Sequence, residues 1–219
     1  MDRRTTLKLA GGALAGLLLP TGPAFARRPF PEDGAIHFSV LRHGGVIGEH
    51  AIRFSHENGH FIVRTDVTVD AGAPGVRPYR YEHHAEEVWA DGWLHAVTSD
   101  TDDDGRLYRL RAGRRDGVFG GAVNGRAFTV SGYIVPSSLW HRDTPASEAL
   151  LDTIDGRVKI VRGRLLGTDE VAVRGKPVNA KHDALSGQIQ RDLWYDSECH
   201  LVRVAFLGRD GSGITLEPR

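Results

Sequence analysis

The chain has 219 residues with 28 basic and 28 acidic side chains, so its formal net charge is zero. This balance argues against a nucleic-acid-binding protein, which normally carries a basic excess. A single cysteine, Cys199, excludes an intramolecular disulfide and any zinc site built from cysteine pairs. The length suits one ordinary domain, and four tryptophans with 40% hydrophobic residues predict a folded chain.

The N-terminus, residues 1–26, has the pattern of an export signal. Basic residues precede an apolar stretch too short to span a bilayer, and Ala24-Phe25-Ala26 supplies a small–x–small cleavage pattern. The pair Arg3-Arg4 resembles the twin-arginine signal, with an ordinary secretory signal as the alternative. We expect the twin-arginine export machinery as a partner, cleavage after residue 26, and a single periplasmic domain at 27–219 without a transmembrane segment.

Alternating strands and tight turns follow the signal. Ile36, Phe38 and Val40 fall on one face of the first predicted strand. Asn-Gly and Asp-Gly pairs, which suit the positive φ angles of hairpin turns, then recur at intervals typical of a β sandwich or barrel. A Gly/Pro loop is expected at 71–78. Strands are expected at 46–56, 60–70, 78–89, 93–99, 107–112, near 118–119 and from 128.

The rhythm breaks between residues 132 and 156. An ordered loop is expected near 131–155, and within it Thr144 and Pro145 favour the start of a two-turn helix that ends near Leu151. Strands then resume at 158–160, 171–173, 188–195, 201–207 and 214–216. The predicted fold class is all-β with minor α: one curved antiparallel meander sheet or half-open barrel, with one short helix.

Several blocks resemble an uncharacterised family of exported bacterial β proteins, a domain of unknown function. The layout is also similar, at fold level, to the half-barrels of periplasmic lipoprotein carriers. The resemblance implies no catalytic residues. The blocks that carry it are Phe38-Ser39-Val40 with Gly44–Gly48, Tyr79–His83, Glu87–Leu94, Ser99–Gly105, Ser137–Trp140 and Leu193–Asp196.

Polar clusters offer weak candidates for metal binding. On a strand, His83 and Glu87 share one face, and His95 on the next strand could add a third ligand. A solvated strand face explains the same residues, so we predict no metal. The acidic stretch Asp100–Gly105 resembles a calcium loop but is read as a hairpin turn, since position 12 of the calcium pattern is Arg111. No cofactor motif is found.

Nucleophilic chemistry has little support. Ser137 and Ser138 lie near His141 and Asp143, but one short loop rarely gives the geometry of a triad. Cys199 has no evident base beside it. We therefore assign no catalytic residues and leave enzyme status open, with a non-enzyme favoured.

The aromatic residues suggest ligand binding. Most should lie in the core, yet the concave face of a half-barrel can stay open to an apolar ligand. Tyr79, Tyr81, Trp89, Trp93 and Trp140 are the predicted ligand-binding residues. The sequence thus predicts a periplasmic protein that binds an apolar or amphipathic molecule, such as a lipid or envelope component. A protein-interaction module of the envelope, or an envelope enzyme with an unrecognised site, are the alternatives.

Overall fold

The computed structural model describes residues 30–72 and 78–219. The expected export signal, and the expected loop at 71–78 apart from its ends, lie outside this part of the chain.

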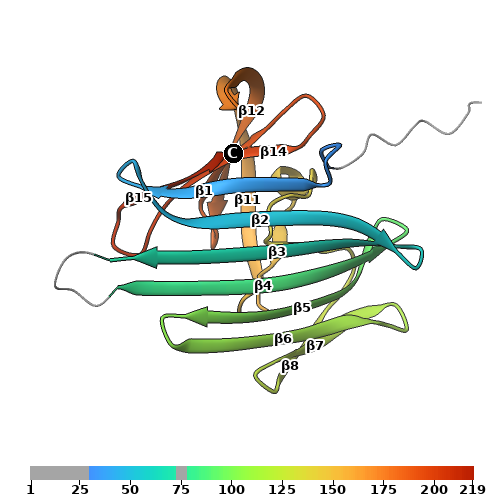
Figure 1. The fold of residues 1–219 in the computed structure, drawn as a ribbon. Helices are drawn as coiled ribbons and strands as arrows, with labels where there is room; N and C mark the ends of the chain where they lie inside the picture. Colours follow the sequence, from blue (N-terminus) through green and yellow to red (C-terminus); the bar gives the residue numbers. More distant parts are fainter. Residues whose placement is uncertain (1–29, 73–77) are drawn as a thin grey trace, which may run out of the picture.

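The described chain forms a single sheet of fifteen strands (Figure 1). The all-β prediction is therefore confirmed. The strands are β1 (Ala35–Arg42), β2 (Gly45–Glu57), β3 (His60–Ala71), β4 (Tyr79–Ala90), β5 (Trp93–Asp103), β6 (Arg106–Arg115), β7 (Val118–Val123), β8 (Arg126–Val130), β9 (Val135–Pro136), β10 (Ala149–Leu151), β11 (Val158–Val173), β12 (Lys176–Gly187), β13 (Arg191–Tyr195), β14 (Leu201–Leu207) and β15 (Gly213–Pro218).

The sheet is a curved meander that does not close into a barrel. Its order is β8-β7-β6-β5-β4-β3-β2-β1-β15-β14-β13-β12-β11-β10-β9. Every pair is antiparallel except β9 with β10. The two edge strands, β8 and β9, are consecutive in the chain, and only residues 131–134 connect them. This short link keeps the two edges of the sheet near each other, as in a half-open barrel.

Most hairpin turns lie where the sequence predicts them. Asn58-Gly59, Asp91-Gly92 and Asn124-Gly125 all have positive φ angles at both positions, the requirement of the turn that best matches strand twist. The turn between β11 and β12 uses Arg174-Gly175, with a φ of 50° at the arginine. The sequence pattern predicts only the two ends of β11 and gives no sign of β12.

The predicted two-turn helix is wrong. One 3-10 turn, Thr144–Ala146, is followed by β10, in which Leu150 and Leu151 are fully buried. β10 pairs with both β9 and β11. Backbone pairing on both sides and burial of two leucines outweigh the modest helix propensity of this stretch.

Residues 137–157, called the inner segment below, pack inside the curve of the sheet. The Ser99 hydroxyl on β5 donates a hydrogen bond to the Thr153 carbonyl. Trp140 packs edge-on against Phe54, Phe61 and Trp89 at ring distances of 5.5 to 5.7 Å. These aromatic rings fill one end of the interior, so the fold is a cup with a packed floor.

A second, small cluster lies on the outer face, away from the cup. Val171, Ala180, Trp194 and Val202 form it. In the part of the chain that the structure describes, no helix is long and apolar enough to cross a membrane.

Candidate functional site

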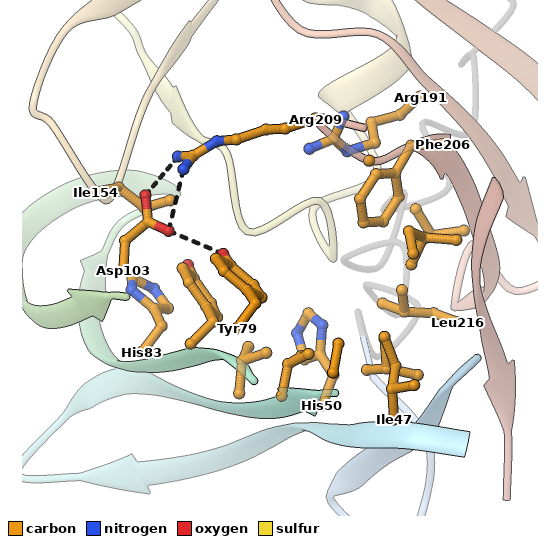
Figure 2. A pocket seen from close by; sticks show the side chains of 18 of the residues that line it. Ile47, His50, Tyr79, His83, Asp103, Ile154, Arg191, Phe206, Arg209 and Leu216 are labelled. Carbon is orange, nitrogen blue, oxygen red and sulfur yellow. Dashed lines mark hydrogen bonds and ion pairs between the residues drawn. The ribbon is translucent and has the colours of Figure 1, made fainter. Parts of the chain in front are cut away.

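A cavity of about 730 Å³ occupies the cup above the aromatic floor (Figure 2). Its walls come from β1 to β4 on one side and from β13, β14 and β15 on the other, and the inner segment contributes Ser138, Leu139 and Ile154. In antiparallel strands alternate residues face the interior, so each strand supplies every second side chain. The volume lies within the range of small-molecule sites, roughly 300–1,000 Å³.

Aliphatic and aromatic side chains cover most of the cavity wall. Matching registers across β14, β15 and β1 set Val204 beside Leu216 and Leu216 beside Val40. Such a surface favours an apolar guest, because burial of apolar area is worth about 25 cal/mol per Å². The aliphatic and aromatic lining comprises Val40, Ile47, Val67, Val69, Ala71, Tyr79, Tyr81, Leu139, Ile154, Ile189, Val204, Phe206, Leu207, Ile214 and Leu216.

An ion pair crosses one end of the cavity. Arg209, in the turn between β14 and β15, donates hydrogen bonds to both carboxylate oxygens of Asp103 on β5, with Nη1 3.3 Å from Oδ1. The Tyr79 hydroxyl donates to the same Oδ1 at 2.8 Å. Burial and the neighbouring Asp103 carboxylate raise the pKa of Tyr79 above its usual value. Figure 2 shows Arg209 extended from its own wall toward Asp103.

Neutral polar groups lie deeper in the cavity. His83 Nδ1 is 2.7 Å from the Thr101 hydroxyl, and burial lowers the His83 pKa to about 4. Burial and the nearby His83 likewise lower the pKa of His50 to about 4. Among the described residues, His50 Nε2 and Thr65 Oγ1 are buried without a hydrogen-bond partner. The deep wall is therefore uncharged near neutral pH and keeps free hydrogen-bonding capacity.

Arg191 brings a charge to the apolar wall. Its guanidinium carbon lies 4.0 Å from the centre of the Phe206 ring, and Nη1 donates to the Gln190 carbonyl at 2.7 Å. Burial lowers the Arg191 pKa, although Asp152 and Tyr81 are near enough to oppose that effect. Within the described chain, no carboxylate lies within 4.0 Å of this guanidinium. Asp152 instead lies 3.5 Å from Lys159 and accepts from the Ile154 amide.

The five predicted ligand-binding aromatics divide into three places. Tyr79 and Tyr81 line the cavity. Trp89 and Trp140 lie in the packed floor and are 4% and 2% exposed. Trp93 lies outside the cavity, where it packs edge-on against Tyr133 and beneath Arg114.

Glu87 is a fully buried carboxyl in the floor. The indole N–H groups of Trp89 and Trp140 both donate to its Oε2, at 2.9 and 3.0 Å. Burial raises the Glu87 pKa, and the hydrogen bonds only partly oppose this effect. Among the described residues, Glu87 Oε1 and the Ser138 hydroxyl are buried without a hydrogen-bond partner. Glu87 therefore ties the inner segment to β4.

The three metal candidates do not converge. His83 and Glu87 face the interior but are engaged with Thr101 and the two tryptophans, whereas the exposed His95 contacts His60 at a ring distance of 5.8 Å. Across residues 30–72 and 78–219, no three His, Cys, Asp or Glu side chains are grouped as metal ligands. The acidic stretch after Asp100 is a hairpin with its turn at Asp104-Gly105.

The serine candidates are not aligned for nucleophilic attack. The Ser137 hydroxyl accepts from the Thr153 amide at 3.2 Å, while His141 stacks on Trp89 at 4.9 Å. His141 Nδ1 accepts from the Asp143 amide at 3.2 Å. Cys199 is a free, half-buried thiol in the turn after β13.

The comparisons define the class of protein to which this cup belongs. Among solved structures, it is similar to a beta-barrel-like protein of domain of unknown function DUF1849 from Brucella abortus, with a TM-score of 0.56 and 11% sequence identity. The match covers 84% of this chain and 94% of that chain, and at such low identity it shows the fold alone. The half-open barrel expected from the sequence is thus confirmed.

The family follows from the sequence match. The model of the domain of unknown function DUF6134 matches residues 38–219, so the chain belongs to this family. The expected membership in an uncharacterised β family is confirmed. No protein of curated function matches the sequence significantly.

Sequence reasoning missed most of the polar cavity residues. His50, Asp103, Arg191 and Arg209 come from four separate strands or turns that only the curvature of the sheet brings together. Strand alternation would have placed Asp103 on the face of Tyr79 and Tyr81, but it gives no sign of the partner Arg209.

Proposed function

We propose that the protein is exported to the periplasm and there binds an apolar or amphipathic small molecule, such as a lipid or envelope component, without acting on it as an enzyme. One observation carries the proposal: a cavity of about 730 Å³ whose wall is mostly aliphatic and aromatic. An apolar cavity with a few convergent polar groups is the usual form of a small-molecule site.

The polar groups favour binding over catalysis. His50 and His83 are held neutral by burial, and His83 contacts the Thr101 hydroxyl. Within the described residues, neither ring forms an ion pair with a carboxylate that would orient it as a catalytic base. Around the cavity, the two members of each ion pair neutralise one another: Lys159 with Asp152, Arg209 with Asp103, and Arg42 with Asp210. Export is supported by the pattern of residues 1–26, in which paired arginines precede an apolar stretch and a cleavage motif.

Native mass spectrometry of the protein purified gently from its host's periplasm tests the proposal. We expect a discrete added mass that disappears after organic extraction. The neutral fluorophore N-phenyl-1-naphthylamine should also gain fluorescence with the purified protein, and the extracted molecule should displace it. A clean apo mass together with no fluorophore binding would overturn the proposal.

An interaction module is the second candidate, and the β11–β12 hairpin favours it. Leu165 and Leu166 on this hairpin are 60% and 43% exposed. Adjacent exposed apolar side chains on a strand are unusual unless they are covered by a partner. If Leu165→Ser with Leu166→Ser abolishes capture of an envelope protein while fluorophore binding persists, both activities belong to the chain.

A further inference from the structure

We propose that the ligand is an anionic amphiphile whose acid group pairs with Arg191. This inference rests on the proposed function and names its ligand class. It depends on the position of one guanidinium in an otherwise apolar wall.

The first argument is charge complementarity. Four arginines line the cavity: Arg42, Arg106, Arg191 and Arg209. Arg42 pairs with Asp210 and Arg209 with Asp103, and Arg106 is exposed. Arg191 is more enclosed than Arg106, yet among the described residues it has no carboxylate partner. Arg191 is half-buried. A charge withdrawn from water is stabilised when it is paired and hydrogen-bonded, so this position favours an anion supplied by the ligand.

The second argument is the part of the guanidinium that stays available. One face of Arg191 lies on the Phe206 ring at 4.0 Å, and Nη1 is engaged by the Gln190 carbonyl. Nε and Nη2 make no hydrogen bond to the described protein. Those two nitrogens form one edge of the fork that binds a carboxylate with two parallel hydrogen bonds. One such edge matches one monoanionic head group.

The third argument is the surface next to Arg191. Phe206 and Ile214 are cross-strand neighbours on β14 and β15, and Leu216 and Val204 continue the same wall. A chain attached to the acid group would therefore lie on aliphatic side chains. Asp152 is near enough to act on Arg191 electrostatically but makes no ion pair with it, and its oxygens contact Lys159 and the Ile154 amide.

Calorimetric titration with three eighteen-carbon probes, each below its micelle concentration, tests the inference. The probes are oleate, oleyl alcohol and oleylamine. With the wild-type protein, we expect oleate to bind at least tenfold more tightly than the alcohol and the amine to bind most weakly. Arg191→Gln should weaken oleate binding by about 10- to 100-fold, the worth of a charged hydrogen-bonded pair, and should leave oleyl alcohol binding within about threefold.

Arg106→Gln is the matched control, because it removes the same charge from an exposed cavity residue. It should change oleate binding by less than about threefold. Arg191→Lys keeps the charge without the fork, and it should fall between wild type and Arg191→Gln. Thermal unfolding of each variant separates loss of binding from loss of fold, and Arg191→Met provides an apolar replacement if Arg191→Gln does not fold.

The outcomes separate this inference from the proposed function. Equal binding of oleate and oleyl alcohol, unaltered by Arg191→Gln, would overturn the role of Arg191 while the apolar site stands. Equal losses of both probes in a folded Arg191→Gln protein would make Arg191 a structural residue and would also overturn it. If no probe binds the wild type, the proposed function itself fails.

Discussion

Arg209 and Asp103 are joined across the cup although 106 residues separate them in the sequence. In the sheet, β4, β3, β2 and β1 lie between β5, which carries Asp103, and the β14–β15 hairpin, whose turn carries Arg209. The pair therefore links two walls that face each other across the cavity rather than two neighbouring strands. The Asp103 side chain is buried and that of Arg209 is 71% exposed. When the ion pair breaks, it is therefore the Arg209 side chain that can move away into solvent.

Removing this link should speed exchange of the cavity's contents. We expect Arg209→Gln to raise the dissociation rate of N-phenyl-1-naphthylamine several-fold, measured by stopped-flow fluorescence. High salt should accelerate release from the wild type in the same direction, since exposed ion pairs are screened. Arg106→Gln, which changes the same charge without breaking the link, should release the fluorophore at the wild-type rate. Identical rates in all three proteins would exclude a gating role for Arg209.

The stability of the floor should depend on pH through Glu87. Its pKa is raised above the ordinary 4.5 by burial, so the folded state holds a proton that the unfolded state releases. The stabilising contribution of Glu87 is then fully present below pH 4.5 and is lost as the pH rises through the raised pKa. Glu87→Gln removes this titration and still offers an oxygen to the two indoles. Urea unfolding should show the variant gaining stability relative to wild type as the pH rises above 4.5.

A matched substitution distinguishes the charge of Glu87 from its hydrogen bonds. Glu87→Leu leaves the N–H groups of Trp89 and Trp140 buried without an acceptor. Each unpaired group costs about 1–3 kcal/mol of stability. We expect this variant to be less stable than Glu87→Gln by at least about 2 kcal/mol at every pH. Equal stabilities for the two variants would show that the indole contacts contribute nothing.

How far the sequence predicts this fold depends on its turns. Asn-Gly and Asp-Gly pairs carry their own backbone preference, so the β2–β3 hairpin and the hairpins from β4 to β8 follow from local signals. The β11–β12 hairpin turns instead at Arg174, which has a φ of 50° without the short polar side chain that favours it. With no such signal, β12 is missed.

The site was predicted less well than the fold, for a related reason. Tyr79 and Tyr81 share a strand, so alternation alone places both on the inner face with His83. Arg191 and Arg209 reach the same cavity from β13 and from the turn after β14, and their sequence neighbours give no sign of it. Trp140 reaches the floor through the inner segment, whose path depends on pairing of β10 with β9 and β11.

Acid should destabilise the cup through its buried histidines. The pKa of His83 is lowered from 6.5 to about 4. Below pH 6.5, His83 is therefore protonated in the unfolded state while it stays neutral in the folded state. Its stabilising contribution is therefore present above pH 6.5 and is lost as the pH falls toward 4. His83→Gln keeps a partner for Thr101 and removes the titration. Between pH 7 and 4.5 its free energy of unfolding should fall by about 2 kcal/mol less than that of wild type. Parallel profiles would show that His83 does not titrate differently in the two states.

Gly163 on β11 sets how closely the inner segment approaches the wall. A Cβ atom at this position would lie 1.9 Å from the Pro145 carbonyl oxygen and 2.8 Å from its carbon, both backbone atoms that cannot rotate away. Gly163→Ala should therefore push the 3-10 turn inward and cost about 1–3 kcal/mol of stability, the usual penalty of overpacking.

Gly213→Ala is the control, because nothing lies within 4 Å of the Cβ it would add, and it should change stability by less than about 0.5 kcal/mol. Chemical denaturation of both variants measures the two stabilities, and fluorophore binding provides a second readout. A Gly163→Ala protein as stable as the control would mean that the inner segment yields freely and is not held against β11.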